Sequence, residues 1–202
     1  MFATRAQLVQ TVVDYLARDD LAPQVGIAIA LFEAKASRRL ALGQMEASAT
    51  LTPDTNGAVT LPASFAQMRY VEALTNPVQI VASAGPEWAD YQYPYVNDGW
   101  PKVYYITGLS LITRPISTYQ IKIGFYAKIP GLVVDSDTNW LLSLAPDLYL
   151  YGVLTEIYAL LHDDGEVEKW QSAHDRSMME MKAQDMSGRW QGGAVRIMGQ
   201  VP

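Results

Sequence analysis

Hydrophobic positions at helical spacing mark the amino-terminal part of this chain. Apolar residues recur every three to four positions from Leu8, and Thr4 with Gln7 forms a capping box ahead of them. A second stretch of this kind runs from about Pro23 towards Leu42, with arginines close to its carboxyl end. The pattern therefore predicts two helices within residues 4–43.

The period of the pattern changes after Met45, where apolar and polar residues alternate. Alternation with a period of two is typical of half-buried strands. Its clearest stretch is Tyr119–Phe125, and clusters of Gly, Pro, Asn and Asp separate the other stretches. We also expect a short helical turn at 63–67. The pattern predicts a block of short antiparallel strands over residues 45–130.

Two helix-start signals follow the strand block. Asp137 or Thr138 can cap a short turn that begins at Asn139, because their side-chain oxygens accept backbone N–H groups. Pro146 then suits a first helical position, where its missing N–H costs nothing. The helix after it, to about His162, is apolar nearly all round, so we expect neighbours to bury it on several sides.

A last helix follows the tight link at 163–165, and its apolar positions form a narrow packing stripe. Ser187-Gly188 and Gly192-Gly193 loosen its end, and Ala194–Met198 is expected to form a last strand or an extended tail. The stripe consists of Val167, Trp170, His174, Met178 and Met181.

This layout predicts an α+β fold: a helical bundle formed by the N- and C-terminal helices, with an inserted block of short antiparallel β-strands. We expect one domain over residues 1–202. Its parts are a helical body at 4–43 and 138–186, a β insertion at 45–130 and an extended C-terminal tail at 187–202.

Composition limits the classes of function. Of 202 residues, 50% are hydrophobic and 18% are charged, which is typical of a globular chain. The absence of cysteine removes disulfides, thiolate metal sites and cysteine nucleophiles. The amino terminus lacks the layout of a secretory signal, and no apolar run approaches the ~20 residues that span a bilayer. We therefore expect a soluble protein made inside the cell, with no membrane partner.

The formal charge of −6 argues against a surface built to neutralise phosphates. No Lys or Arg occurs between Lys128 and Lys169, although acids are frequent there. One interpretation is a capped helix followed by a solvated acidic turn. The other is a surface that must not adhere to a polyanion. The acids are Asp135, Asp137, Asp147, Glu156, Asp163, Asp164, Glu166 and Glu168.

The chain carries no glycine-rich phosphate loop, dinucleotide fingerprint or nucleophile elbow. Its two histidines, His162 and His174, would have to meet with a carboxylate to bind a metal, and ordinary capping and packing roles are the stronger interpretation. Glu87, Asp90 and Asp98 lie among aromatic residues, so a carboxylate hydrolase is a further hypothesis. We predict no catalytic, cofactor-binding or metal site.

The aromatic segment 88–100 is the better lead towards a binding function. Tyr and Trp in loops stack on sugars, and they are also favoured at protein interfaces. The segment therefore supports a carbohydrate-binding module as an alternative function, beside the plain interpretation that it covers the open end of a small sheet. Its aromatic members are Trp88, Tyr91, Tyr93, Tyr95 and Trp100.

An ordered set of short motifs resembles the head-to-tail adaptor proteins of tailed bacteriophages, also called head completion or connector proteins. The resemblance covers roughly residues 4–181, and the order and spacing of the motifs are more specific than any one of them. The motifs are Leu61-Pro62-Ala63-Ser64-Phe65 with Arg69, Tyr105-Ile106-Thr107-Gly108 with Leu111, Pro115, the run containing Ile121, Ile123, Tyr126, Ile129, Pro130 and Leu132, then Thr138-Asn139-Trp140-Leu141-Leu142, Pro146-Asp147-Leu148-Tyr149-Leu150-Tyr151-Gly152, and Trp170.

The resemblance implies a structural virion protein without catalysis or cofactor. Such an adaptor is expected to form a dodecameric ring in the neck, under the portal protein. The ring would extend the DNA channel used in ejection and present a docking surface to a tail, stopper or nozzle protein. Viral dsDNA would pass through its lumen without sequence-specific binding. The segment after Ser187 would reach the portal, and the protein would be made in the host cytoplasm.

Overall fold

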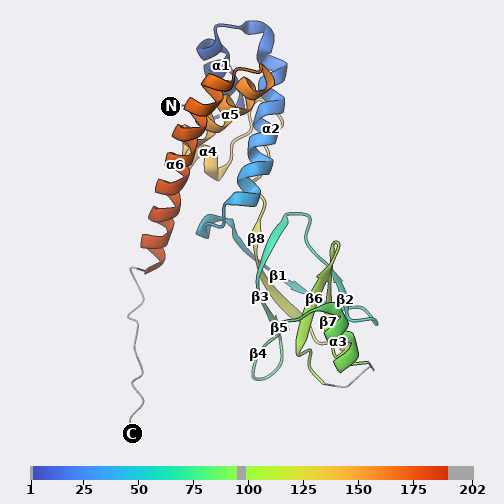
Figure 1. The fold of residues 1–202 in the computed structure, drawn as a ribbon. Helices are drawn as coiled ribbons and strands as arrows, with labels where there is room; N and C mark the ends of the chain where they lie inside the picture. Colours follow the sequence, from blue (N-terminus) through green and yellow to red (C-terminus); the bar gives the residue numbers. More distant parts are fainter. Residues whose placement is uncertain (1, 95–98, 191–202) are drawn as a thin grey trace. The chain divides into compact units, whose positions relative to one another are not determined.

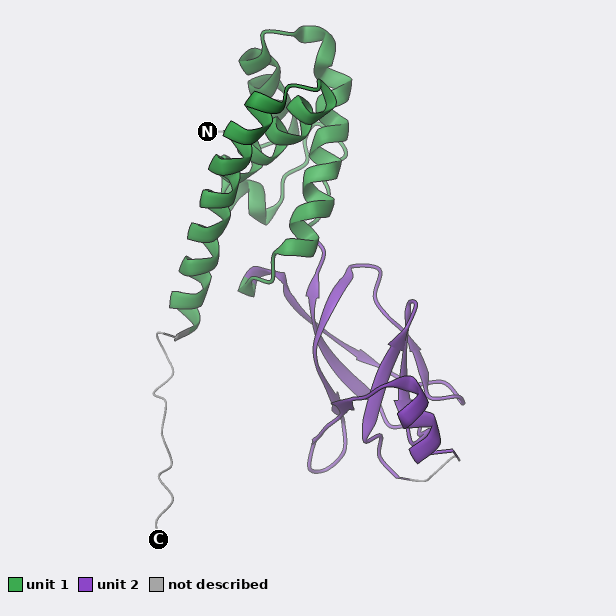
Figure 2. Cartoon of the chain, in the orientation of Figure 1, with its two compact units in different colours: residues 1–43, 129–202 green, residues 44–128 purple. Residues whose placement is uncertain are grey.

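The structure is a computed structural model that describes residues 2–94 and 99–190 (Figure 1). The chain divides into two compact units (Figure 2). Residues 1–43 and 129–202 belong to the first, which we call the helical unit, and residues 44–128 form the second, which we call the β unit. Both ends of the chain therefore contribute to the same unit. That the whole chain acts as one domain stays a prediction.

The helical unit is centred on α5 (Pro146–Leu160), which packs against α1, α2, α4 and α6. Leu148, Val153 and Ile157 of α5 are fully buried, because neighbouring helices cover it on several sides. Figure 1 shows α5 between α2 and α6. The other elements of the unit are α1 (Arg5–Leu16), the 3-10 turn η1 (Asp19–Leu21), α2 (Ala22–Arg39), α4 (Trp140–Leu144) and α6 (Asp164–Trp190).

The β unit contains two four-stranded sheets among its described residues, with the orders β1-β8-β3-β4 and β2-β7-β6-β5. All neighbouring strands are antiparallel except β5 and β6, which are parallel. The elements are η2 (Gly43–Met45) at the boundary, β1 (Glu46–Leu51), β2 (Ala58–Thr60), β3 (Phe65–Ala73), β4 (Gln79–Ile80), β5 (Ala82–Ser83), α3 (Pro86–Gln92), β6 (Val103–Thr107), β7 (Ser110–Arg114) and β8 (Ile121–Ala127).

One buried apolar cluster joins the two sheets of the β unit. Ile121, Ile123 and Phe125 of β8 alternate into this cluster, where Val59 and Leu111 of the other sheet meet them. Because both sheets contribute inward side chains, the sheets pack face to face. The strand β8 lies inside its sheet, paired with β1 on one side and β3 on the other.

The predicted α+β class is confirmed, whereas the strand block differs from the expectation in two places. Of the helical turn expected at 63–67, residues 63–64 do form a turn, closed by a bond from the Phe65 N–H to the Pro62 carbonyl at 2.9 Å. Residues 65–67 instead begin β3, because Phe65 pairs with Ala127 and its ring packs against Phe125 at 5.7 Å. The helix α3 was not expected. It begins with two local start signals, Pro86 in its first turn and the acid Glu87 near its positive end, and Ala89 packs it into a small apolar cluster beside β6.

Two helix ends also differ from the prediction. The helix α2 ends at Arg39 rather than near Leu42, because Leu42 is itself drawn into the core at 1% exposed. The helix α6 continues through 187–190, where a tail was expected to begin, and an Arg189–Asp185 ion pair of 2.7 Å supports its last turn. The later tail, with the strand considered at 194–198, lies outside the described residues. Over the described ranges, no helix is long and apolar enough to cross a membrane.

Candidate functional site

A buried polar cluster fixes the segment that leads from the strands back into the helices. Asn139 caps α4, and its Oδ1 accepts the backbone N–H of Leu142 at 2.8 Å. Its Nδ2 donates to the carbonyl of Pro130 at 2.7 Å and to the hydroxyl of Tyr149 at 2.6 Å. The Tyr149 hydroxyl donates in turn to Glu33 Oε1 at 2.9 Å. The cluster therefore ties this segment, α4, α5 and α2 to one another.

The cap of α4 lies later than the sequence pattern predicted. Asp137 does not cap the helix; it closes the preceding turn by accepting the N–H groups of Val133 and Val134, each at 2.8 Å. These two bonds hold the pKa of the Asp137 carboxyl below its ordinary value. Thr138 is exposed, and the extended backbone of Asn139, with φ of −142° and ψ of 170°, suits an N-cap.

Burial alters the acid–base behaviour of the cluster. It raises the pKa of Glu33 above the ordinary value, although hydrogen bonds from Tyr149 and from the N–H of Leu132 oppose the shift. Burial, together with the charge of Glu33, also raises the pKa of Tyr149, so its phenol stays protonated and remains a donor. Asn139 and Tyr149 belong to the motifs of the resemblance, whereas Glu33 was not among the candidate residues. The available signal was Glu33, a lone acid at helical spacing from Ile29 and Ala36 on the buried face.

Six of the eight acids between Lys128 and Lys169 have hydrogen-bond or ion-pair partners in the structure. Asp164 and Glu168 are exposed and have none within the described part of the chain. This arrangement favours the interpretation as a capped helix followed by a solvated turn. Asp135 pairs with Arg5, Asp137 closes its turn, Asp147 accepts from Ser177, Glu156 pairs with Lys35, Asp163 accepts from Glu166 N–H, and Glu166 accepts from Lys169 and Trp170.

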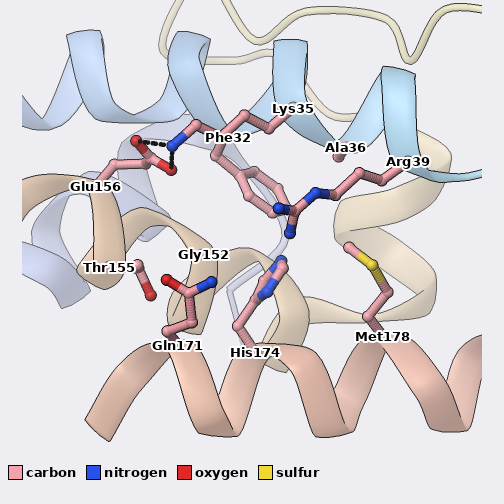
Figure 3. Close-up of a pocket in the computed structure, with 10 residues that line it drawn as sticks. All are labelled: Phe32, Lys35, Ala36, Arg39, Gly152, Thr155, Glu156, Gln171, His174 and Met178. Carbon is pink, nitrogen blue, oxygen red and sulfur yellow. Dashed lines mark hydrogen bonds and ion pairs between the residues drawn. The ribbon is translucent and has the colours of Figure 1, made fainter. Parts of the chain in front are cut away.

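A small groove opens between α2, α5 and α6 (Figure 3). Lys35 reaches across it, and its ammonium donates to both oxygens of Glu156 at 2.6 and 2.8 Å. The space open to water is about 50 Å³, which accommodates a few water molecules and is too small for a sugar or cofactor. The lining residues are Phe32, Lys35, Ala36, Arg39, Gly152, Thr155, Glu156, Gln171, His174 and Met178.

The two histidines occupy different environments. His162 is exposed just after α5, with a φ of 58°. His174 is 8% exposed and lies edge-on to Phe32, with ring centroids 6.0 Å apart, and its Nδ1 lies 3.1 Å from Asp175. In the regions that the structure describes, no group of three or more His, Cys, Asp and Glu side chains could hold a metal ion.

The aromatic segment is only partly covered by the protein. Trp88 and Tyr91 project from α3 at 52% and 84% exposed, and Trp88 packs edge-on against Tyr93 with ring centroids 6.3 Å apart. Trp100 is half-buried. Tyr95 lies outside the described residues. The segment therefore presents two exposed rings on one short helix.

The three carboxylates of the hydrolase hypothesis do not form a pair in the described structure. Asp90 anchors α3 to the sheet: it accepts from the Tyr105 hydroxyl at 3.0 Å and from Arg114 Nε at 2.8 Å. Glu87 is exposed on α3. Asp98 lies outside the described residues. Asp90 is thus held in a structural role.

Trp170, one of the residues that carry the resemblance, joins three helices. Its indole N–H donates to Glu166 at 2.9 Å, and its ring packs edge-on against Tyr15 of α1 at 5.2 Å and stacks on Tyr151 of α5 at 5.8 Å. The Trp170 side chain is 8% exposed. Trp170 therefore serves to hold these helices together.

Comparison with known proteins agrees with an architectural role. The family model described as SU10 adaptor protein matches residues 3–197, which include both units. No curated protein matches the chain significantly.

Proposed function

Because the chain belongs to the SU10 adaptor protein family, a family of phage head–tail adaptors, we propose that it forms a dodecameric ring that joins the portal to the tail. It is a structural protein of the virion neck that connects head and tail components. The family match over residues 3–197 is the observation that carries the proposal.

The proposed partners are the portal protein on one side of the ring and a tail, stopper or nozzle protein on the other. Viral dsDNA passes through the lumen without sequence-specific binding. The net charge of −6 supports this, because a negative lining would not hold the polyanion during ejection. The protein is made in the host cytoplasm and is added to the portal there.

A non-enzymatic role is the simplest account of the polar residues described above. Asn139, Tyr149 and Glu33 bond to one another and stabilise the helical unit, and Asp90 anchors α3 to the sheet. The family match gives no support to the alternative of a carbohydrate-binding module. We further propose that the whole chain acts as one adaptor domain, and that residues 191–202 contact the portal.

Imaging of the chain mixed with purified portal rings tests the proposal. We expect twelve copies in one ring on the portal, with a matching mass by native mass spectrometry. A chain that ends at Trp190 is the matched control and should bind portal more weakly. A full-length chain that remains monomeric with portal present, and never binds it, would disprove the proposal. Monomers without portal do not decide the question, because the ring can require the portal as a template.

A further inference from the structure

We propose that the outward faces of α2 and α6, on opposite sides of the helical unit, meet each other between neighbouring copies of this chain. The inference rests on the proposed ring and names the surfaces that build it. Their relative direction and their charges identify a second copy as the occupant.

The outward face of α2 is apolar over two turns. Ile27 and Leu31 are 56% and 40% exposed, and Ala30 and Ala34 beside them are exposed as well. The opposite face of the same helix already fills the core, with Phe32 at 2% exposed. A surface helix normally carries polar residues on its outer side. An uncharged stripe with small alanines instead allows another helix to approach closely.

The outward face of α6 carries a second stripe. Met179 and Met186 are 70% and 60% exposed, and Ala183 between them is exposed too. These positions are three to four residues apart, so they share one side of the helix. Methionine is flexible and adapts to irregular surfaces, which makes it a common contact residue at interfaces.

The two stripes point away from each other. The inner faces of α2 and α6 look towards one another across the groove, as Figure 3 shows for Phe32 and His174. Outer faces of two helices that face each other must lie on opposite sides of the unit. A ring needs this arrangement, because each copy must offer one surface to the copy before it and a different surface to the copy after it.

The position of residues along the two helices, together with one pair of opposite charges, indicates how the two faces meet. The two helices run in the same direction on either side of the groove: Phe32 of α2 contacts His174 of α6, and the N–H of Gly43, just beyond the end of α2, donates to Asp185 at 2.9 Å. Both pairs are 142 positions apart in sequence, and so are Arg38 and Glu180. Arg38 is therefore level with Glu180 on the other side of the unit.

Two copies side by side with parallel helices bring Arg38 of one copy next to Glu180 of the other. Both side chains are exposed, and neither has an ion-pair partner among the described residues. Of the three cations of α2, Lys35 pairs with Glu156 and Arg39 with Asp175 inside the helical unit, which leaves Arg38 for an acid of a neighbouring copy. At the same offset Met179 is level with Ser37, which is less than one helical turn from Ala34. These matches favour a second copy over an unrelated partner.

Crosslinking in neck complexes tests the contact, and the absence of native cysteine makes each crosslink unambiguous. A chain with Ala34→Cys and Met179→Cys, assembled on portal and treated with a short bismaleimide, should give a ladder of oligomers up to the closed ring. Each single variant should give no crosslink above background. A mixture of the two single variants should stop at dimers. The control pair is Ala34→Cys with Leu144→Cys, since Leu144 on α4 is 49% exposed but lies on neither stripe.

The experiment distinguishes a failure of the proposed contact surface from a failure of the proposed function. A normal ring on portal without the ladder would show that other faces meet, and would leave the proposed function intact. Crosslinking of Ala34→Cys alone would mean that like faces meet, which also overturns the inference. If the unmodified chain never joins portal, the proposed function itself fails.

A second pair of variants does not depend on crosslinking chemistry. Ile27→Asp and Met179→Asp each block one stripe at an exposed position, so both chains should fold. Each alone should fail to form rings, and their mixture should form dimers through the two intact stripes. Rings from either variant alone would contradict the inference.

Discussion

The interactions that stabilise the β unit internally differ from those that stabilise the helical unit. In the β unit, backbone pairing and one apolar cluster fix the strands, and the polar anchor Asp90 lies at the surface with its side chain 51% exposed. In the helical unit, the segment from Ile129 to Asn139 has no regular structure, and buried side chains bond its backbone instead. Because buried backbone groups need partners, irregular chain in a core depends on a few polar side chains.

The comparison suggests where each unit is vulnerable. Removing one buried anchor of the helical unit leaves several groups without partners, whereas a surface anchor of the β unit is replaced by water. Hydrogen exchange resolved by peptide segment can follow the two units separately, which a single melting curve does not do.

The largest effect is expected for Asn139→Ala. It removes the cap of α4 and also the donor to Pro130 and Tyr149, so the free energy of unfolding of the helical unit should fall by about 3 kcal/mol. The matched variant Asp90→Ala should cost the β unit under about 1 kcal/mol, because water reaches that anchor. Equal losses of exchange protection in the two units would contradict the comparison.

The second-largest loss of stability is expected when a buried glycine of the helical unit is replaced, and a glycine of the β unit provides the matched variant. A Cβ at Gly152 on α5 would lie 2.2 Å from the ring of Phe32, and one at Gly124 on β8 would lie 2.2 Å from the ring of Tyr70. Phe32 is 2% exposed and locked by its neighbours, whereas Tyr70 is half-buried and can swing outward. Gly152→Ala should therefore cost about 2 kcal/mol, even after the gain in helix propensity.

Gly124→Ala should cost under about 0.5 kcal/mol, because the ring of Tyr70 moves into solvent rather than into the core. Urea unfolding followed by hydrogen exchange gives both values. A loss at Gly124 as large as that at Gly152 would show that Tyr70 is as constrained as Phe32.

The helices were predictable because their signals are local. The Thr4 cap is present and accepts the N–H of Gln7, Pro146 opens α5, and the stripe of α6 holds Trp170 and Met178 in the core. Periodicity and caps depend on residues within a turn of one another, so one sequence shows them. The strand β8 was found for the same reason, although it begins two residues later than predicted, at Ile121.

The buried cluster and the stripes were not predictable because their partners are distant in sequence. Glu33 and Tyr149 are 116 positions apart, and no local pattern pairs them. The exposure of Ile27 depends on where α5 and α6 lie, since the sequence shows apolar residues on both sides of α2. The cap at Asn139 was missed because Asp137 and Thr138 offer the same signal nearby. The bonds of Asn139 to Pro130 and Tyr149, which are tertiary contacts, determine which of the three residues caps α4.

The smallest effect concerns pH and distinguishes the buried acid of the helical unit from the surface acids of both units. Burial raises the pKa of Glu33 above its ordinary value of 4.5, so the folded state holds this proton more tightly than the unfolded state does. Its contribution to stability is present below pH 4.5 and is lost as the pH rises through the higher folded value. Glu33→Gln removes that dependence and keeps an oxygen that accepts from Tyr149 and Leu132.

The free energy of unfolding of Glu33→Gln, minus that of the unmodified chain, should therefore increase from acid towards neutral pH. The change should be smaller than the effect of Gly152→Ala. Asp137 has a lowered pKa and contributes in the opposite direction, but both chains retain it, so the difference isolates Glu33. Urea unfolding at a series of pH values gives the measurement. A difference that stays constant would mean that Glu33 titrates as a surface acid does, and that the cluster does not shield it from water.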